Sequence, residues 1–259
     1  MLLNEFDDSP AIIEPTDKAV RGGGEVCETI ILSFAGDMVE ELAGLPQVHL
    51  GGYLQNLNGK QSWFIYQRSR QKVAVCLAPV GAPAIVGVLE ELKAKGFRRF
   101  IIMGSCGILD KTITSQTIIL PVSALRDEGT SYHYAPASEE IRYDEASLAI
   151  MEKVFDRHSI SYIKTKTWTT DAFYRETPEK VKRRMSSGAA VVDMEAAAIM
   201  AWARFRQAEV CQFFYPADYV NRLDGAWEAR RKSLPDWLPL FDLALAIAKE
   251  AENEAILEE

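Results

Sequence analysis

Predicted strands and predicted helices alternate along this chain, and this alternation limits the possible folds more than any other feature. Short apolar runs rich in β-branched residues predict buried strands, and longer stretches with apolar residues at helical spacing predict helices. The helix predicted at 82–96 has Pro83 in its first turn and Gly96 as its C-terminal cap. The predicted strands are 29–34, 62–68, 72–80, 98–107, 114–125, 161–170 and 209–218; the predicted helices are 36–45, 82–96, 145–159, 178–188 and 235–259, and 191–207 begins extended and becomes helical.

This order of elements predicts a single α/β domain over residues 1–259, built on a central mixed, mostly parallel β-sheet that is flanked by helices. Residues 1–28 are predicted to be irregular, because they contain Pro10, Pro15 and three consecutive glycines. In sheets of this kind ligands bind beyond the C-terminal ends of the strands. Polar residues at those ends are therefore the first candidates for a functional site.

Composition excludes several classes of protein. The net charge of -8 argues against nucleic-acid binding through bulk positive charge. The four cysteines lie far apart and show no metal-ligand spacing, which predicts no metal site and reduced thiols in a cytoplasmic protein. No apolar run reaches the roughly 20 residues that span a bilayer, and the acidic first residues are unlike a signal peptide. We therefore expect neither a membrane nor a nucleic acid as a partner.

Two carboxylates, Asp193 and Glu195, lie in the otherwise apolar stretch VVDMEAAAIMAWA at 191–203. Burying a carboxylate without partners is unfavourable, so each one needs either water or a task. Asp193 stands at a strand-to-helix junction, where such a residue caps the helix. Glu195 lies two residues further on and shares its side of an extended segment. A carboxylate there is a suitable acceptor for a vicinal diol, such as the 2′ and 3′ hydroxyls of a ribose.

The stretch IIMGSCGIL at 101–109 predicts a buried strand that ends in a glycine turn. Gly104 and Gly107 would allow the backbone to approach a ligand, and Ser105 adds a hydroxyl beside free N–H groups. Such a turn suits an anion or a sugar hydroxyl. The alternative is a plain tight turn, because no Gly-Lys-Ser/Thr follows as it does in a phosphate-binding loop.

Two further segments lie at the ends of predicted strands. In TTDAFYRET at 169–177, Phe173 or Tyr174 is placed to stack on a planar base, and the alternative has Phe173 in the core with Asp171 capping the next turn. In FFYPADYV, Asp218 comes at the end of the last predicted strand. It would act as a general acid if its surroundings raise its pKa, and the alternative is a loop residue that caps the next segment.

Together these segments resemble the nucleoside phosphorylase family, which comprises the hexameric purine nucleoside and uridine phosphorylases and their nucleosidase relatives. The resemblance extends from about Thr29 to Ala229. The family's ribose motif is similar to VDMEAAAI, and a motif of the purine enzymes is similar to IMGSCG. The family's base-site loop is similar to TTDAFY, whereas the uridine branch is closer to LRDEGTSYHYAP. The spacing of Met194, Asp218 and Arg231 also matches the bacterial purine enzymes. The resemblance implies a phosphorylase/hydrolase-like fold whose sheet is partly closed like a barrel.

The resemblance also implies roles for individual residues. The assigned residues are Asp218 and Arg231 for catalysis, Met194 and Glu195 for the ribose, Phe173 and Tyr174 for the base, and Ser105 and Gly104 for phosphate. Asp218, assisted by Arg231 or its neighbour Arg230, would protonate the base as it leaves. The reaction would use phosphate as a co-substrate, with no other cofactor and no metal. The nucleoside and phosphate would be the small-molecule partners, and the chain would form a homo-oligomer, either a dimer or a hexamer.

The phosphate end of the pattern departs from the family. FAGDMVEEL keeps Gly36 and Asp37 of the family's phosphate loop but has Met38 and no arginine, and Ile102 stands where the family has a strand arginine. Loss of two bidentate ligands would weaken phosphate binding. The sequence predicts a nucleoside phosphorylase that prefers purine ribonucleosides, with uridine as a further substrate. The alternatives are a hydrolytic nucleosidase, in which Asp37 or Glu40 helps to activate water, and a catalytically weak nucleoside-binding relative.

Overall fold

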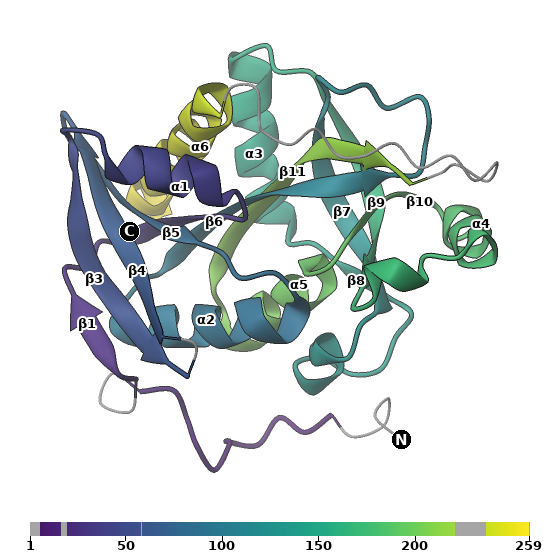
Figure 1. The fold of residues 1–259 in the computed structure, drawn as a ribbon, viewed down its shortest axis with the longest axis horizontal. Helices are drawn as coiled ribbons and strands as arrows, with labels where there is room; N and C mark the ends of the chain where they lie inside the picture. The colour runs from purple at the N-terminus through teal and green to yellow at the C-terminus, as the bar shows by residue number, and fades with distance from the viewer. Residues whose placement is uncertain (1–5, 17–19, 58, 221–236, 259) are drawn as a thin grey trace.

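The computed structural model describes residues 6–16, 20–57, 59–220 and 237–258. An eleven-stranded β-sheet forms its centre, with helices on both sides (Figure 1). The strands are β1 (Gly22–Gly24), β2 (Thr29–Ser33), β3 (Val48–Asn56), β4 (Gly59–Arg68), β5 (Gln71–Leu77), β6 (Arg99–Ile108), β7 (Ile118–Asp127), β8 (Glu140–Arg142), β9 (Tyr162–Thr170), β10 (Ala189–Asp193) and β11 (Glu209–Tyr219). The helices are α1 (Gly36–Ala43), α2 (Ala82–Lys95), α3 (Glu145–Arg157), α4 (Pro178–Ser186), α5 (Ala196–Arg206) and α6 (Leu238–Glu258), with short 3₁₀ helices η2 (Thr130–His133) and η3 (Phe173–Arg175).

The sheet is mixed and partly closed. Its strand order is β1-β3-β4-β5-β2-β6-β10-β9-β7-β11, and β11 also pairs with β6, so that β6, β10, β9, β7 and β11 form a ring. Within the ring, β6 pairs in parallel with β11, and β9 pairs in parallel with both β7 and β10. Beside the ring, β2 pairs in parallel with both β5 and β6. The strands β1, β3, β4 and β5 extend from β2 as an antiparallel wing. The predicted α/β class and the barrel-like closure are confirmed.

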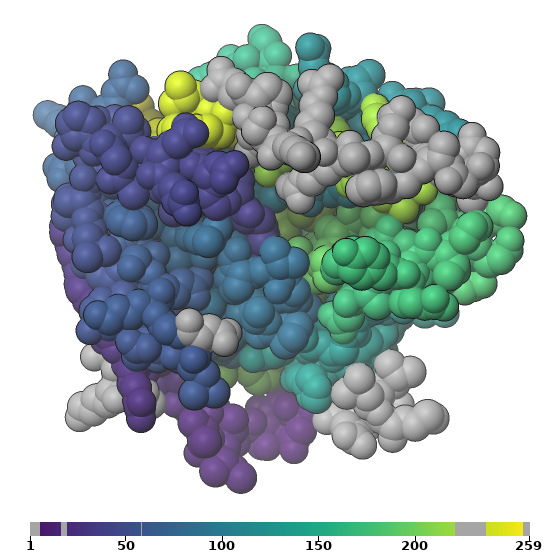
Figure 2. All heavy atoms as spheres, in the orientation of Figure 1, coloured from purple at the N-terminus to yellow at the C-terminus, as the bar shows by residue number. Residues whose placement is uncertain are grey.

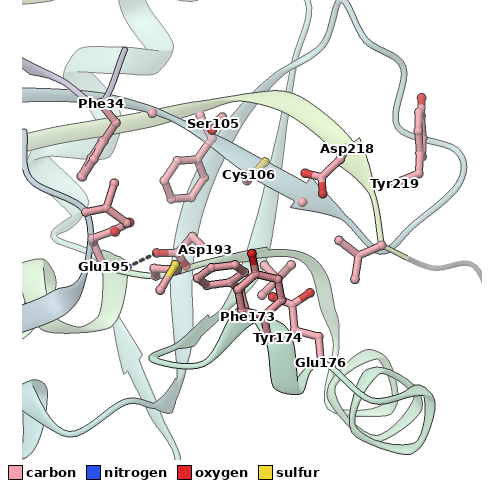
Figure 3. Close-up of a pocket in the computed structure, with 17 residues that line it drawn as sticks. Phe34, Ser105, Cys106, Phe173, Tyr174, Glu176, Asp193, Glu195, Asp218 and Tyr219 are labelled. Atoms are coloured by element: carbon pink, nitrogen blue, oxygen red, sulfur yellow. Dashed lines mark hydrogen bonds between the residues drawn. The ribbon is translucent and has the colours of Figure 1, made fainter. Parts of the chain in front are cut away.

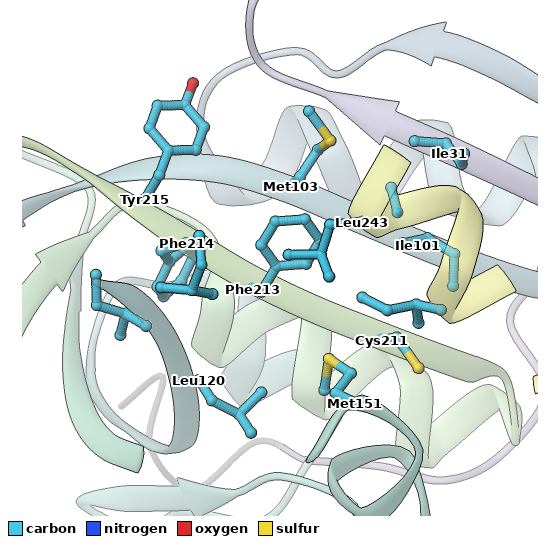
Figure 4. Close-up of a cluster of buried hydrophobic side chains, with 14 of the residues drawn as sticks. Ile31, Ile101, Met103, Leu120, Met151, Cys211, Phe213, Phe214, Tyr215 and Leu243 are labelled. Carbon is cyan, nitrogen blue, oxygen red and sulfur yellow. The ribbon is translucent and has the colours of Figure 1, made fainter. Parts of the chain in front are cut away.

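The core lies on both faces of this sheet. Successive residues of β6 alternate between two clusters of buried apolar side chains: Ile101 and Met103 belong to the first, and Phe100 and Ile102 to the second. The first cluster packs under α1, α3 and α6 (Figure 4), and the second under α2. Helix α5 contributes to both, and its alanines at 196–198 are fully buried. Their small side chains allow the helix backbone to approach the sheet closely.

The predicted helices are confirmed, with small shifts at their ends. Helix α2 ends at Lys95, and the backbone N–H of Gly96 donates to the carbonyls of Leu92 and Lys93. Gly96 has a φ of 111°, the left-handed conformation that a glycine cap supplies without strain. Helix α6 begins at Leu238, and residues 235, 236 and 259 of the predicted terminal helix lie outside the described residues. Within the described ranges, no helix is both long enough and apolar enough to cross a membrane.

Three strands correct the sequence expectation. Strand β1 lies in the segment expected to be irregular, and β3 and β8 are additional to the predicted set. Strand β3 contains two consecutive glycines, Gly51 and Gly52. A Cβ at Gly52 would lie 2.4 Å from Cζ2 of Trp63, and one at Gly51 would lie 2.7 Å from Cδ1 of the same ring. These glycines are therefore required because the fully buried side chain of Trp63 lies against the strand.

Candidate active site

A cavity of about 730 Å³ opens where several strands end. Its walls come from β6, β10 and β11 and from the segments that follow β2, β5 and β9. The expectation that polar residues at strand ends share one site is met in this cavity. In the space-filling view the N-terminal part of the chain, in purple and blue, forms one side of the molecule, and the segment with α4, in green, forms the other (Figure 2). Residues of both parts line the cavity, including Phe34 and Val80 from the first and Phe173 from the second.

The structure brings the residues predicted for the site together, although they are far apart in the sequence. The lining residues include Gly104, Ser105, Phe173, Tyr174, Met194, Glu195 and Asp218 (Figure 3). Arg230 and Arg231, predicted to assist the acid, lie outside the described residues. Asp37 and Glu40 are exposed on α1 and do not belong to the described lining of the cavity.

Asp193 is a structural residue at the end of β10. Its Oδ1 accepts hydrogen bonds from the hydroxyls of Thr167 (2.7 Å) and Thr169 (2.9 Å). Its Oδ2 accepts from the backbone N–H of Glu195 (2.7 Å) and of Ala196 (2.6 Å), the first residues of the α5 turn. Burial raises the pKa of Asp193, while these four donors oppose the rise. The capping role is confirmed, and its effect is to fix the backbone of Glu195.

Glu195 is held at the wall of the cavity by one strong contact. Its Oε1 accepts a hydrogen bond of 2.7 Å from the backbone N–H of Gly81, which precedes the first turn of α2. The residue is only 7% exposed. Burial, reinforced by the negative charge of Asp193, raises the pKa of Glu195 to about 8. A buried carboxyl group with one oxygen fixed by an amide is preorganised to accept hydrogen bonds from a polar ligand.

Asp218 reaches the cavity from β11. It pairs with Gly107 of β6 immediately after an irregularity in the register of the two strands, and such irregularities redirect side chains. Asp218 is therefore a strand residue and not a loop residue, and the segment that it was to cap, 221–236, lies outside the described residues. The structure also corrects the expected turn, because β6 continues through the glycines to Ile108.

The two glycines of β6 make room for side chains. A Cβ at Gly104 would lie 2.9 Å from the ring of Phe34. A Cβ at Gly107 would lie 2.8 Å from Val192 and 2.6 Å from Val220. The absence of a side chain at these positions thus shapes the cavity wall through its neighbours. The expected turn is therefore absent at these positions, and Gly104 and Gly107 line the cavity as residues of a continuous strand.

Phe173 and Tyr174 form an aromatic pair in η3, between the Glu195 end of the cavity and Glu176 (Figure 3). Their ring centroids are 4.1 Å apart at an interplanar angle of 41°. Phe173 is 49% exposed and Tyr174 89% exposed, so the alternative that places Phe173 in the core is wrong. Asp171 accepts a hydrogen bond from the backbone N–H of Gly129 instead of capping the next turn. An exposed pair of rings at a cavity wall suits a planar ligand.

The sequence pattern does not single out Glu176, yet it lines the same cavity. Burial raises the pKa of Glu176 to about 7; the charge of Asp218 adds to the rise and Lys180 opposes it. In Figure 3 Glu176 and Asp218 lie at the same end of the cavity, away from Glu195. In the sequence Glu176 is one acid in a polar segment, and nothing in that pattern distinguishes it from a solvated side chain.

The cavity is strongly acidic. Carboxyl groups of Glu176, Asp193, Glu195 and Asp218 line it, and none of its described lining residues is Lys, Arg or His. In the part of the chain that the structure describes, no three His, Cys, Asp or Glu side chains are grouped so that they hold a metal ion. The arrangement therefore offers carboxyl groups for proton transfer and for accepting hydrogen bonds, beside an aromatic wall.

This fold and this cavity agree with the comparison with known families. Residues 30–237 match the family model described as Phosphorylase superfamily. Because the match covers most of the chain, this chain belongs to the phosphorylase superfamily. A guanosine phosphorylase from Halorubrum lacusprofundi is 25% identical over 142 residues, which cover 54% of this chain and 59% of that protein. The chain spans between 56% and 62% of the length of the first curated relatives that it matches.

Solved structures extend the comparison to the whole fold. A purine nucleoside phosphorylase from Toxoplasma gondii, in complex with immucillin-H, has a TM-score of 0.72 at 18% identity and covers 94% of this chain and 96% of its own. An AMP nucleosidase from Bacteroides thetaiotaomicron has a TM-score of 0.69 at 16% identity, with coverage of 88% and 90%. At such identities the likeness concerns the fold, and the predicted phosphorylase-like fold is confirmed.

Proposed function

We propose that this chain cleaves the N-glycosidic bond of a ribonucleoside and transfers the ribosyl group to phosphate, with a purine preferred and uridine as a further substrate. The observation that carries the proposal is the meeting of Glu195, Asp218 and Phe173 in one cavity. Each offers what one part of a nucleoside requires: acceptors for the sugar hydroxyls, an acid for the base and a ring for stacking. Membership of the superfamily supports the same reaction.

The chemistry assigns a task to each group. Breaking the bond from C1′ to the base nitrogen leaves positive charge on the sugar and negative charge on the base. Asp218, in its protonated form, donates its proton to a ring nitrogen of the departing base. Glu195 accepts hydrogen bonds from the ribose hydroxyls, and Met194 packs against the sugar. Phosphate, held near Ser105 and Gly104, attacks C1′ and gives ribose 1-phosphate, with no further cofactor.

Hydrolysis is the second candidate, and the charge of the cavity favours it. Four carboxyl groups line the site. Negative charges repel a phosphate dianion at short range but leave a water molecule unaffected. Met38 and Ile102 stand where the family has arginines, so the positive charges that would bind phosphate are missing at these two positions. Water attacking C1′ would give free ribose and the same free base.

The two nucleophiles are distinguished by following base release from inosine, adenosine and uridine with and without phosphate. Phosphorolysis predicts release that depends on phosphate, with ribose 1-phosphate as the sugar product. Equal release without phosphate, with free ribose as the product, would establish hydrolysis instead. Binding of nucleosides without any base release would show a nucleoside-binding relative and would contradict both reactions.

We also propose that the protein works as a homo-oligomer, either a dimer or a hexamer. Apolar side chains at the cavity are unusually exposed: Val80 is 64% and Tyr174 is 89% exposed. Exposed apolar side chains that gather around a site mark interaction surfaces. Light scattering on the purified chain is expected to give two or six times the chain mass. A monomer at micromolar concentration would contradict the proposal.

A further inference from the structure

Glu176 is a carboxyl group of the cavity that the proposed reaction leaves without a task. It follows the aromatic pair directly, lines the cavity and is half-buried. Within the described residues, no hydrogen bond or ion pair engages its side chain. A partly buried acid in this position is expected to have a hydrogen-bond partner. A ligand stacked on Phe173 is a suitable partner, because Glu176 and Phe173 lie on the same wall.

Glu176 and Asp218 face the same part of that ligand. Both residues lie at the end of the cavity away from Glu195 (Figure 3), and the charge of Asp218 acts on Glu176. A base that turns one edge toward this end of the cavity therefore meets both groups. The edge of a purine that carries N7 presents this ring nitrogen beside the substituent at position 6. That substituent is an amino donor in adenine and an oxygen acceptor in guanine and hypoxanthine.

We propose that Glu176 selects nucleosides of 6-aminopurines, by accepting a hydrogen bond from the 6-amino group while Asp218 protonates N7. The assignment rests on the proposed function, which places the acid at N7. An ionised carboxylate only accepts hydrogen bonds, so it pairs with an amino group and repels a 6-oxo oxygen. A buried group left facing another acceptor is strongly disfavoured, which gives discrimination of about ten- to a hundredfold.

This selection depends on pH. Burial raises the pKa of Glu176 to about 7; the charge of Asp218 on β11 adds to the rise and Lys180 on α4 opposes it. Above that pH the carboxylate favours the 6-amino group. Below it, the protonated carboxyl group donates a hydrogen bond to a 6-oxo oxygen. The preference for adenosine over inosine therefore rises with pH. Titration of Glu195 affects both substrates, so it largely cancels in the ratio of their rates.

The test measures kcat/KM for adenosine and for inosine at about pH 6 and about pH 8, in wild type, E176Q and E179Q. The ratio of the two kcat/KM values changes with pH only if the residue that distinguishes the two bases gains or loses a proton in this range. Gln has nearly the shape of Glu, does not titrate, and both donates and accepts, so E176Q is expected to use the two nucleosides about equally at both pH values. E179Q makes the same charge change at an exposed residue on α4 that pairs with Lys182. It is expected to behave as wild type.

Wild type is expected to prefer adenosine at least about tenfold at about pH 8 and less at about pH 6. The same ratio in wild type at both pH values, or in wild type and E176Q, would overturn the role of Glu176. If wild type cleaves neither nucleoside, the proposed function fails, and calorimetric binding of adenine and hypoxanthine still tests Glu176. A preference for adenine that E176Q loses would support the selection, whereas equal binding or no binding would overturn it.

Discussion

Asp218→Asn is expected to lower kcat for base release from adenosine by at least about a hundredfold, with little change in KM. Asn preserves the shape of the side chain in β11 but holds no acidic proton for the leaving base. General-acid catalysis of this kind contributes about a hundred- to ten-thousandfold. Because the proton is transferred only in the transition state, the loss falls on kcat rather than on binding. Steady-state kinetics on the purified variant measures both parameters.

A substrate that needs no proton separates the role of an acid from a structural role. A purine nucleoside methylated at N7 already carries positive charge on the base and leaves without protonation. Asp218→Asn is therefore expected to retain most of its activity on that substrate. The matched control is Asp242→Asn, which removes one negative charge from an exposed position on α6. Equal loss of activity on methylated and unmethylated substrates would show that Asp218 is not the acid.

The elements of the fold are largely predictable, because their signals are local. The run TIILS forms β2 where the sequence predicts a strand, and α2 stops at Gly96 because a left-handed residue ends it. The exceptions follow from contacts between distant residues. Strand β3 was not predicted, and its Gly52 leaves the space that the ring of Trp63 on β4 occupies. No local pattern contains that information.

The same distinction applies to the site. Asp218 and Glu195 are predictable as candidates, since each stands at a strand end in a recognisable motif. The hydrogen bond from Gly81 to Glu195 joins residues 114 positions apart, so it emerges only from the fold. Glu176 becomes a candidate only when the fold sets it opposite Asp218. Its local sequence, a single acid between Arg175 and Thr177, is equally typical of an exposed turn.

Glu195→Gln is expected to stabilise the protein while impairing its function. Glu195 has a pKa of about 8 in the folded state, above the 4.5 that is usual for Glu. Folding therefore favours its protonated form, and the destabilisation caused by ionisation grows as pH rises from about 4.5 to about 8. Gln stays neutral and its carbonyl still accepts from Gly81. The variant is expected to gain about 2 kcal/mol in free energy of unfolding at about pH 8 and almost nothing at about pH 4.5.

At about pH 8 and above, where Glu195 ionises, the gain in stability is expected to accompany an about ten- to hundredfold loss in kcat/KM, because a neutral amide replaces the charged acceptor of the ribose hydroxyls. Urea unfolding across this pH range measures the first effect, and adenosine kinetics measures the second. Glu250→Gln is the matched control with the opposite sign. Hydrogen bonds from Arg157 and Lys153 lower the pKa of Glu250, so its ionised form stabilises the fold above its ordinary pKa, and Gln lowers stability there. If Glu195→Gln were also destabilising at about pH 8, the buried carboxylate would be a structural group, and a ribose-binding role would lose its physical basis.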